Sequence, residues 1–216
     1  MIKHSVILLK RDHKRFRNVK NNIQKHIPNL NIFNAFDYKK ESIDFFCLEN
    51  GIKISDRYTS MNAKTGGIAN VISHIKLWKK MIKYNIPEMV VLEDDGKINS
   101  GHFVNLNNLK KDLPIDYNLC LIYVGERQYR NDNEVQINRK YINKGYKNYG
   151  MICYLISLSG AKHMLEEFKT IKQLIDVQIN QLVKNTKNIH KIFSAKYPFV
   201  SKKNLPSNVL NTEKYK

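Results

Sequence analysis

Residues 90–95, with the sequence VVLEDD, constrain the fold most strongly, because three apolar residues run directly into three carboxylates. Pro87 and Gly96 bound this segment, and an apolar run between two such breakers is typical of a buried strand. The acids would then lie where the strand leaves the core. Two interpretations stay open at this point: a solvated acidic turn, which is common, or a site at which magnesium or manganese gathers the oxygens.

Apolar runs and helical periodicities alternate along the rest of the chain. Buried strands are predicted at 5–9, 30–36, 117–125 and 150–156, with one more in the tail, and helices at 16–23, 43–48, 66–82, 103–109, 161–168 and 175–183. This alternation predicts an α/β fold: one Rossmann-like domain over residues 1–216, with a mainly parallel central sheet flanked by helices. Ligands of such sheets bind beyond the carboxyl ends of the strands, where residues 93–95 and 125–126 should meet.

The helix that opens at Gly66 and Gly67 has one continuous apolar stripe. Its members recur at helical spacing and are Ile68, Val71, Ile72, Ile75, Trp78 and Ile82. At 100° per residue, His74 lies at the edge of this stripe, so Ser73 and His74 are expected at the boundary between core and cleft. His74 is then either a hydrogen-bonded structural histidine or a residue of the site.

Other polar residues have two interpretations each. Asp12 is placed to cap a helix whose Arg15 could meet a phosphate or simply face solvent. Asp176 stands in the first turn of a helix, where the helix dipole alone favours a carboxylate. The aperiodic segment 126–149 is interpreted as a substrate-facing loop, 55–64 as a loop and 197–216 as an irregular tail.

The net charge of +18 favours anionic partners such as phosphorylated substrates or an anionic membrane surface. The lysines are spread along the chain and no nucleic-acid-binding motif accompanies them, so specific nucleic-acid binding is not expected. Three separate cysteines in apolar settings predict reduced thiols. The first residues lack a cleavage site and no apolar run reaches the roughly 20 residues of a membrane span, so a cytoplasmic protein, peripheral to a membrane at most, is expected.

Several blocks together resemble glycosyltransferase family 25, which includes lipooligosaccharide galactosyltransferases and galactosyltransferases acting on collagen hydroxylysine. The blocks are residues 67–74 (GIANVISH), Leu77-Trp78, residues 91–95 (VLEDD), residues 154–157 (YLIS), residues 160–162 (GAK) and Ile175-Asp176. They follow one another in the family's order over nearly the whole chain. The start, with Arg11 and Arg15 after an apolar strand, is similar less closely.

The resemblance implies a GT-A type enzyme that moves a hexose, galactose or glucose, from a UDP-sugar to a glycan or hydroxylysine-type acceptor. Residues 93–95 would play the part of the DXD motif. In this scheme Mn²⁺ or Mg²⁺ binds Asp95 together with Glu93 or Asp94, and which two of the three carboxylates touch the ion stays open; His190 is a further candidate ligand. Arg15, Gly67, Ser73, His74 and Asp94 would contact the donor or shape its pocket. The family is regarded as inverting, which calls for a general base; Asp176 is the first candidate and Glu126 the second.

The chain departs from the family pattern at Ala69-Asn70, where a cysteine or similar small residue is usual, and the segment 126–149 aligns with nothing. The acceptor is therefore open. Two other functions also stay open: a catalytically silent, nucleotide-sugar-binding module, and a polyanion-binding protein recognised by steeply salt-dependent affinity.

Overall fold

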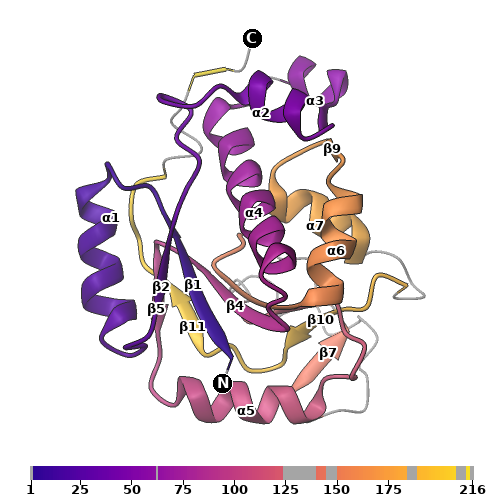
Figure 1. The fold of residues 1–216 in the computed structure, drawn as a ribbon. Helices are drawn as coiled ribbons and strands as arrows, with labels where there is room; N and C mark the ends of the chain where they lie inside the picture. The colour runs from indigo at the N-terminus through magenta and orange to yellow at the C-terminus, as the bar shows by residue number, and fades with distance from the viewer. Residues whose placement is uncertain are drawn as a thin grey trace.

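The computed structural model describes residues 2–61, 63–123, 140–144, 150–183, 189–207 and 213–214. A sheet with the strand order β2-β1-β4-β8-β6-β10-β7 forms its centre (Figure 1). Its strands are β1 (Lys3–Leu8), β2 (Asn31–Asn34), β4 (Glu88–Glu93), β6 (Leu119–Leu121), β7 (Ile142–Lys144), β8 (Cys153–Ser157) and β10 (Ile192–Ala195). Two small two-stranded sheets pair β3 (Lys53–Ile54) with β9 (Thr170–Ile171), and β5 (Gly96–Ile98) with β11 (Val200–Lys202).

The strand directions make the sheet mixed but mostly parallel. The pairs β1–β2, β1–β4 and β6–β10 are parallel, whereas β8 is antiparallel to both of its neighbours and β7 is antiparallel to β10. Five strands of the central sheet therefore run in one direction, and β7 and β8 run against them. The predicted α/β class with a mainly parallel sheet is confirmed, and the reversal of β8 is the feature that the alternation of elements did not reveal.

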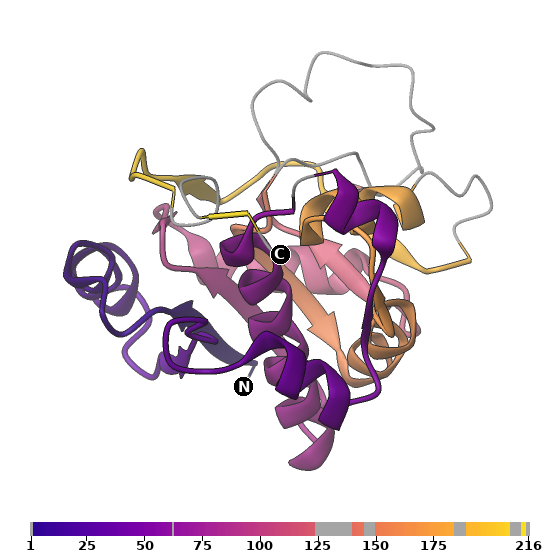
Figure 2. The same ribbon diagram turned by 90° about the horizontal axis from the view of Figure 1, so that it is seen from above.

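Helices cover both faces of this sheet (Figures 1 and 2). The helical segments are α1 (His13–Asn18), the π-helical η1 (Val19–Gln24), α2 (Ile43–Glu49), α3 (Asp56–Ser60), α4 (Thr65–Lys83), α5 (His102–Asp112), α6 (Leu158–Glu167) and α7 (Ile175–Val183). One apolar cluster joins a sheet face to α4, α6 and α7; the second joins the opposite face to η1 and α5. In β4, Met89 and Val91 belong to the first cluster and Val90 and Leu92 to the second, so this strand is buried on both faces as predicted.

Helix α4 follows its predicted stripe. Ile68, Val71, Ile72, Ile75 and Trp78 are buried, and Ile82 packs partly buried against the same cluster. Polar atoms inside this face are paired with one another. The Tyr154 hydroxyl of β8 accepts a hydrogen bond from Trp78 Nε1 (3.0 Å) and lies 2.8 Å from His74 Nδ1. This buried group fixes α4 against the middle of the sheet.

Two segments predicted to be irregular contain regular structure. Residues 55–64 include α3, because the Ser55 hydroxyl caps it by accepting the Tyr58 N–H (3.2 Å). The segment 197–216 includes β11, which pairs with β5 at the end of the acidic turn. Most of the segment 126–149 lies outside the described residues; its described part, 140–144, contains β7. Among the described residues, no helix is both long and apolar enough to cross a membrane.

Gly160 is expected to tolerate no side chain. A Cβ added there would lie 1.9 Å from the carbonyl oxygen of Asn118 and 2.6 Å from its carbon, and both atoms are backbone. Helix propensity alone would favour Gly160→Ala by about 1 kcal/mol. We expect a net loss of about 3 kcal/mol in the free energy of unfolding instead, because α6 must move off the sheet.

Urea denaturation measures this loss. Lys162→Ala, on the exposed side of the same helix, is the matched control and should stay within about 0.5 kcal/mol of the parent. A Gly160→Ala protein as stable as the parent would show that α6 does not approach β6 this closely.

Candidate active site

A cleft of about 460 Å³ opens at the carboxyl ends of β1, β2 and β4. Its walls come from the loops after these strands, the first turns of α4, the segment that leads into β8, the start of α7 and the tail after β11. Six residues singled out from the sequence line it: Arg15, Ser73, Glu93, Asp94, Asp95 and Asp176. The expected position of a ligand site beyond the strand ends thus coincides with the cleft.

The turn between β4 and β5 holds the three acids in place. Glu93 is the last residue of β4, and Asp94 and Asp95 form the turn. The buried Asn18 side chain donates to the carbonyl oxygens of Asp94 (2.8 Å) and Gly96 (3.1 Å), so it spans the turn from behind. On the other side, Lys203 N donates to the Asp95 carbonyl oxygen (2.7 Å). The backbone of the turn is therefore fixed from two distant parts of the chain.

Glu93 is held by two residues one helical turn apart on α4. Asn70 Nδ2 donates to Glu93 Oε1 (3.1 Å), and His74 Nε2 lies 3.5 Å from the same oxygen. Burial would raise the pKa of Glu93, but its contacts with His74 and Asn70 and the charge of Arg15 lower the pKa overall. Glu93 is therefore a carboxylate with a fixed orientation at neutral pH.

Asp94 is engaged by Arg15. Arg15 Nη1 donates to Asp94 Oδ1, and Arg15 Nη2 donates to the carbonyl oxygen of Pro206 in the tail (2.8 Å). Burial raises the pKa of Asp94 to about 7, although Arg15 acts in the opposite direction. This ion pair occupies Asp94 Oδ1, so Asp95 is the more accessible partner for Glu93 if a cation were held at the turn.

Asp95 has an unsatisfied oxygen. Its Oδ1 atom is buried and has no hydrogen-bond partner among the described residues, while Oδ2 lies 3.9 Å from Lys202 Nζ and 4.0 Å from Arg15 Nη2. Burial, followed by the charge of Glu93, raises the pKa of Asp95 to about 6. A buried carboxylate oxygen without a donor is costly, and a divalent cation would satisfy it. The oxygen-only donors of Glu93 and Asp95 therefore fit Mn²⁺ or Mg²⁺.

Asp176 lies in the same cleft, in the first turn of α7. Its Oδ2 accepts the Gly150 N–H (2.8 Å) and its Oδ1 accepts the Val177 N–H (2.9 Å). Burial raises the pKa of Asp176, and the charge of Glu93 adds to the rise against the two hydrogen bonds. A carboxylate with a raised pKa in the same cleft as the acidic turn has the properties that a general base needs.

Ser73 and two further predicted residues, His74 and Gly67, have structural contacts around the cleft. The Ser73 hydroxyl accepts the Phe36 N–H (2.9 Å) and donates to the Ala69 carbonyl oxygen (2.7 Å), so it anchors the loop after β2. His74 is fully buried and is not among the residues that line the cleft. Gly67 is buried in the first turn of α4, beside Gly66, which does line the cleft.

The last two predicted residues are not placed in the cleft. Glu126 lies outside the described residues. His190 precedes β10, and because β10 runs in the same direction as β4, the start of β10 lies at the sheet edge opposite Glu93 and Asp95. His190 instead contacts His163 and Glu167. The prediction that His190 shares a cation with the acidic triplet was wrong, because sequence spacing does not show at which edge a strand begins.

Sequence reasoning missed four residues that shape the cleft: Asn18, Asn70, Lys202 and Pro206. Of these, only Asn70 carried a usable signal. It precedes His74 by four residues on a predicted helix, and residues at this spacing project from the same face. The other three approach the acids from segments distant in the sequence.

The fold and the cleft define an α/β protein that can bind a ligand against a carboxylate cluster at the carboxyl edge of its sheet. Residues 1–183 match the family model described as glycosyltransferase family 25 (LPS biosynthesis protein). The chain belongs to this family.

Three relatives by sequence agree with this assignment. The chain is 29% identical over 68% of its length to a "Glycosyltransferase 25 family member" of Aedes aegypti. It is 30% identical over 58% to "Procollagen galactosyltransferase 1-A" of Xenopus laevis, and 27% identical over 51% to a "Probable inactive glycosyltransferase 25 family member 3" of Bos taurus. The matches cover 27%, 22% and 19% of those proteins, so the chain spans about a quarter or less of their length. A solved active-site mutant of LgtC is 9% identical, with a TM-score of 0.49, over 95% of this chain and 88% of that one.

Proposed function

We propose that residues 1–216 form a domain that transfers a hexose, galactose or glucose, from a UDP-sugar to a hydroxyl of a glycan or hydroxylysine-type acceptor. Membership of glycosyltransferase family 25 supports transfer, and the relative named as a procollagen galactosyltransferase supports galactose and a collagen-type acceptor. The net charge of +18 favours an anionic acceptor, or an acceptor carried on an anionic membrane.

The observation that carries this proposal is that one cleft combines a buried, donor-free Asp95 oxygen with Glu93, Arg15 and Asp176. Glu93 and Asp95 would hold Mn²⁺ or Mg²⁺. A cation bound there supplies Lewis-acid stabilisation of the departing diphosphate. Arg15 offers a guanidinium at the same place, which can turn from Asp94 to a phosphate oxygen of the donor. Gly67, Ser73 and His74 would shape the donor pocket through the helix start and the loop that they hold.

Asp176 would act as the general base of an inverting single displacement. Its carboxylate takes the proton of the acceptor hydroxyl while that oxygen bonds to the anomeric carbon, and the bond from this carbon to the diphosphate oxygen breaks. The raised pKa of Asp176 increases its strength as a base. Its two backbone hydrogen bonds hold the carboxylate in one orientation.

A second candidate function is a nucleotide-sugar-binding module without transfer. The bovine relative whose name describes it as probably inactive favours this alternative. The two functions differ in one respect: both bind the donor, and only the first releases UDP.

A calorimetric screen of UDP- and GDP-sugars, with and without MnCl₂, followed by a UDP-release assay, tests the proposal. We expect a UDP-hexose to bind at least 10-fold more tightly with Mn²⁺, because Glu93 and Asp95 would hold a cation that attracts the diphosphate, and we expect UDP release to require Mn²⁺ or Mg²⁺. Tight binding with no release on any acceptor, including hydroxylysine peptides and anionic glycans, would select the silent module. No binding of any sugar nucleotide would exclude both functions.

A further inference from the structure

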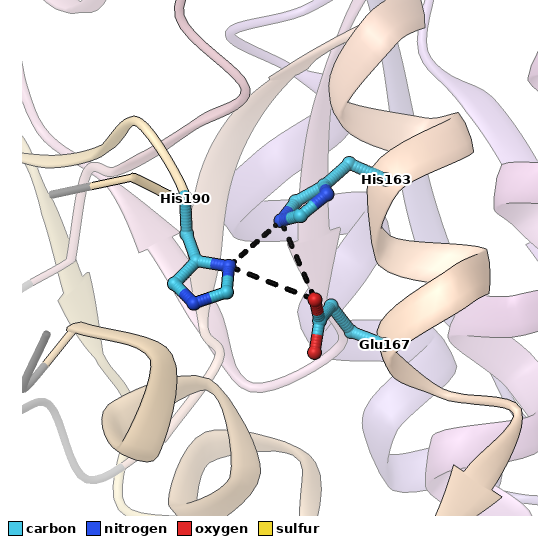
Figure 3. Close-up of side chains that lie close together, drawn as sticks. All are labelled: His163, Glu167 and His190. Carbon is cyan, nitrogen blue, oxygen red and sulfur yellow. Dashed lines mark hydrogen bonds and ion pairs between the residues drawn. The ribbon is translucent and has the colours of Figure 1, made fainter.

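A second group of potential metal ligands lies away from the cleft, where α6 faces the segment before β10. His163 and Glu167 are four residues apart on this helix, so both side chains project from one face. His190, two residues before β10, points at them from the neighbouring segment (Figure 3). The three side chains are partly buried, with 28%, 31% and 15% of their surface exposed for His163, Glu167 and His190. An ion could therefore reach them from solvent.

The distances among their ligand atoms suit a small ion. His163 Nε2 lies 3.0 Å from His190 Nδ1 and 3.9 Å from Glu167 Oε1, and His190 Nδ1 lies 3.7 Å from Glu167 Oε1. A tetrahedral Zn²⁺ with bonds of about 2.0–2.1 Å places its ligand atoms roughly 3.3–3.4 Å apart. The three observed separations bracket this value, so small side-chain rotations would bring all three atoms into the first shell of one ion.

The cluster is held together by a shared support. Asn118, just before β6, donates from its side chain to the His190 carbonyl oxygen (3.0 Å). The same residue forms the backbone surface against which Gly160 of α6 packs, and its carbonyl oxygen accepts the Ser157 N–H (3.1 Å). Both segments that carry ligands are thus fixed to one residue. Such support lowers the ordering cost of binding an ion.

A hydrogen-bonded histidine pair is the simpler explanation of this arrangement. In that case one imidazole donates to the other, and Glu167 adds only a long contact. A histidine pair alone does not account for the convergence of two imidazole nitrogens and one carboxylate oxygen at one point.

We propose that His163, Glu167 and His190 form a second metal site, which takes Zn²⁺ or a similar borderline transition-metal ion and leaves one position open for water. Imidazole ligands select such ions, whereas the oxygen-only donors of Glu93 and Asp95 suit Mn²⁺ or Mg²⁺. The two sites lie on different parts of the molecule. The bound ion would connect α6 to the segment that leads into β10.

The test is calorimetric titration of the whole chain with ZnCl₂ in excess MgCl₂, together with CoCl₂ titration followed by visible absorption. We expect one Zn²⁺ per chain and cobalt bands typical of a four-coordinate site. His163→Gln, Glu167→Gln and His190→Gln should each weaken zinc binding at least 10-fold. Zn²⁺ should raise the melting temperature of the parent but not of these variants.

Two controls separate this site from other sources of zinc binding. His26→Gln removes an exposed imidazole elsewhere on the surface, and Asp95→Asn alters the cleft; both should keep the parent's zinc affinity. Zinc binding that is unchanged in His163→Gln and His190→Gln, or that is lost in Asp95→Asn, would overturn the proposal. Glu167→Gln replaces a partly exposed group with an isosteric one, so it tests the site even where a histidine variant folds poorly.

Discussion

Asp95→Asn is expected to reduce transfer at least 10³-fold, about 4 kcal/mol of transition-state stabilisation, because the amide would remove an anionic ligand from the proposed cation. Of the three acids, Asp95 is the most informative one to substitute. Arg15 already engages Asp94, and Asn70 and His74 already orient Glu93, whereas Asp95 Oδ1 is buried without a donor. The measurements are UDP release at saturating donor and the affinity for Mn²⁺.

The same variant should be more stable than the parent when no metal is added. Because folding raises the pKa of Asp95 to about 6, the folded state prefers the protonated carboxyl, and this stability is lost as pH rises through 6. Asparagine resembles the protonated form at every pH. We expect a gain on the order of 2 kcal/mol at pH 7.5, which disappears near pH 4.

Asp116→Asn is the matched control. Asp116 is exposed and pairs with Lys191 on the surface, so the substitution makes the same chemical change without touching the cleft. Activity and metal affinity should stay at the parent level. Full activity in Asp95→Asn would instead exclude Asp95 as a ligand and leave the acidic turn without its proposed role.

Asp176→Asn is expected to reduce kcat about 10²–10⁴-fold with little change in donor affinity. The reason is that an amide cannot take up the proton of the hydroxyl group that receives the sugar. Calorimetric titration with donor checks that the cleft still forms. Asparagine has one acceptor oxygen for the two N–H groups that Asp176 now binds, but it also removes a buried charge, so the free energy of unfolding should change by less than about 1 kcal/mol.

The pH profile distinguishes a base from a residue that only holds Gly150. A base works when it is deprotonated, so activity should rise with pH through the pKa of Asp176. Since burial raises this pKa, the acid limb should lie above the range of an ordinary aspartate. Asp176→Asn should abolish this limb in whatever activity remains. If the variant keeps the parent's rate and profile, the base is another group, and Glu126 becomes the first candidate.

Elements with strong local patterns could be predicted from the sequence. The apolar residues of α4 recur at helical spacing over a span of 15 residues, from Ile68 to Ile82. The core of β4 is an apolar run between Pro87 and Gly96. In both segments the local pattern of apolar residues is enough to predict the element. The direction of β8 could not be predicted, because an apolar strand reads the same in either direction. The short elements α3 and β11 were also not predicted, because α3 depends on a capping serine and β11 on pairing with a strand distant in the sequence.

The site was predictable to the extent that its residues follow buried strands. The triplet could be placed at a sheet edge from the run before it, and the placement of Asp176 came from the family resemblance. The partners of these acids could not be predicted. Lys202 and Pro206 reach the cleft from the tail, and Asn18 reaches it from α1, so only the packing of distant segments brings them together.

The reversed direction of β8 has a consequence for how this family could diversify. Because β8 runs against β4 and β6, the chain both leaves β6 and enters β8 at the cleft side of the sheet. Gly150, at the entry to β8, touches Asp176 there. The connection between these two strands therefore begins and ends at the cleft side of the sheet, and its described part includes β7, which pairs with β10. Exchanging this connection between relatives should transfer acceptor choice without transferring donor choice.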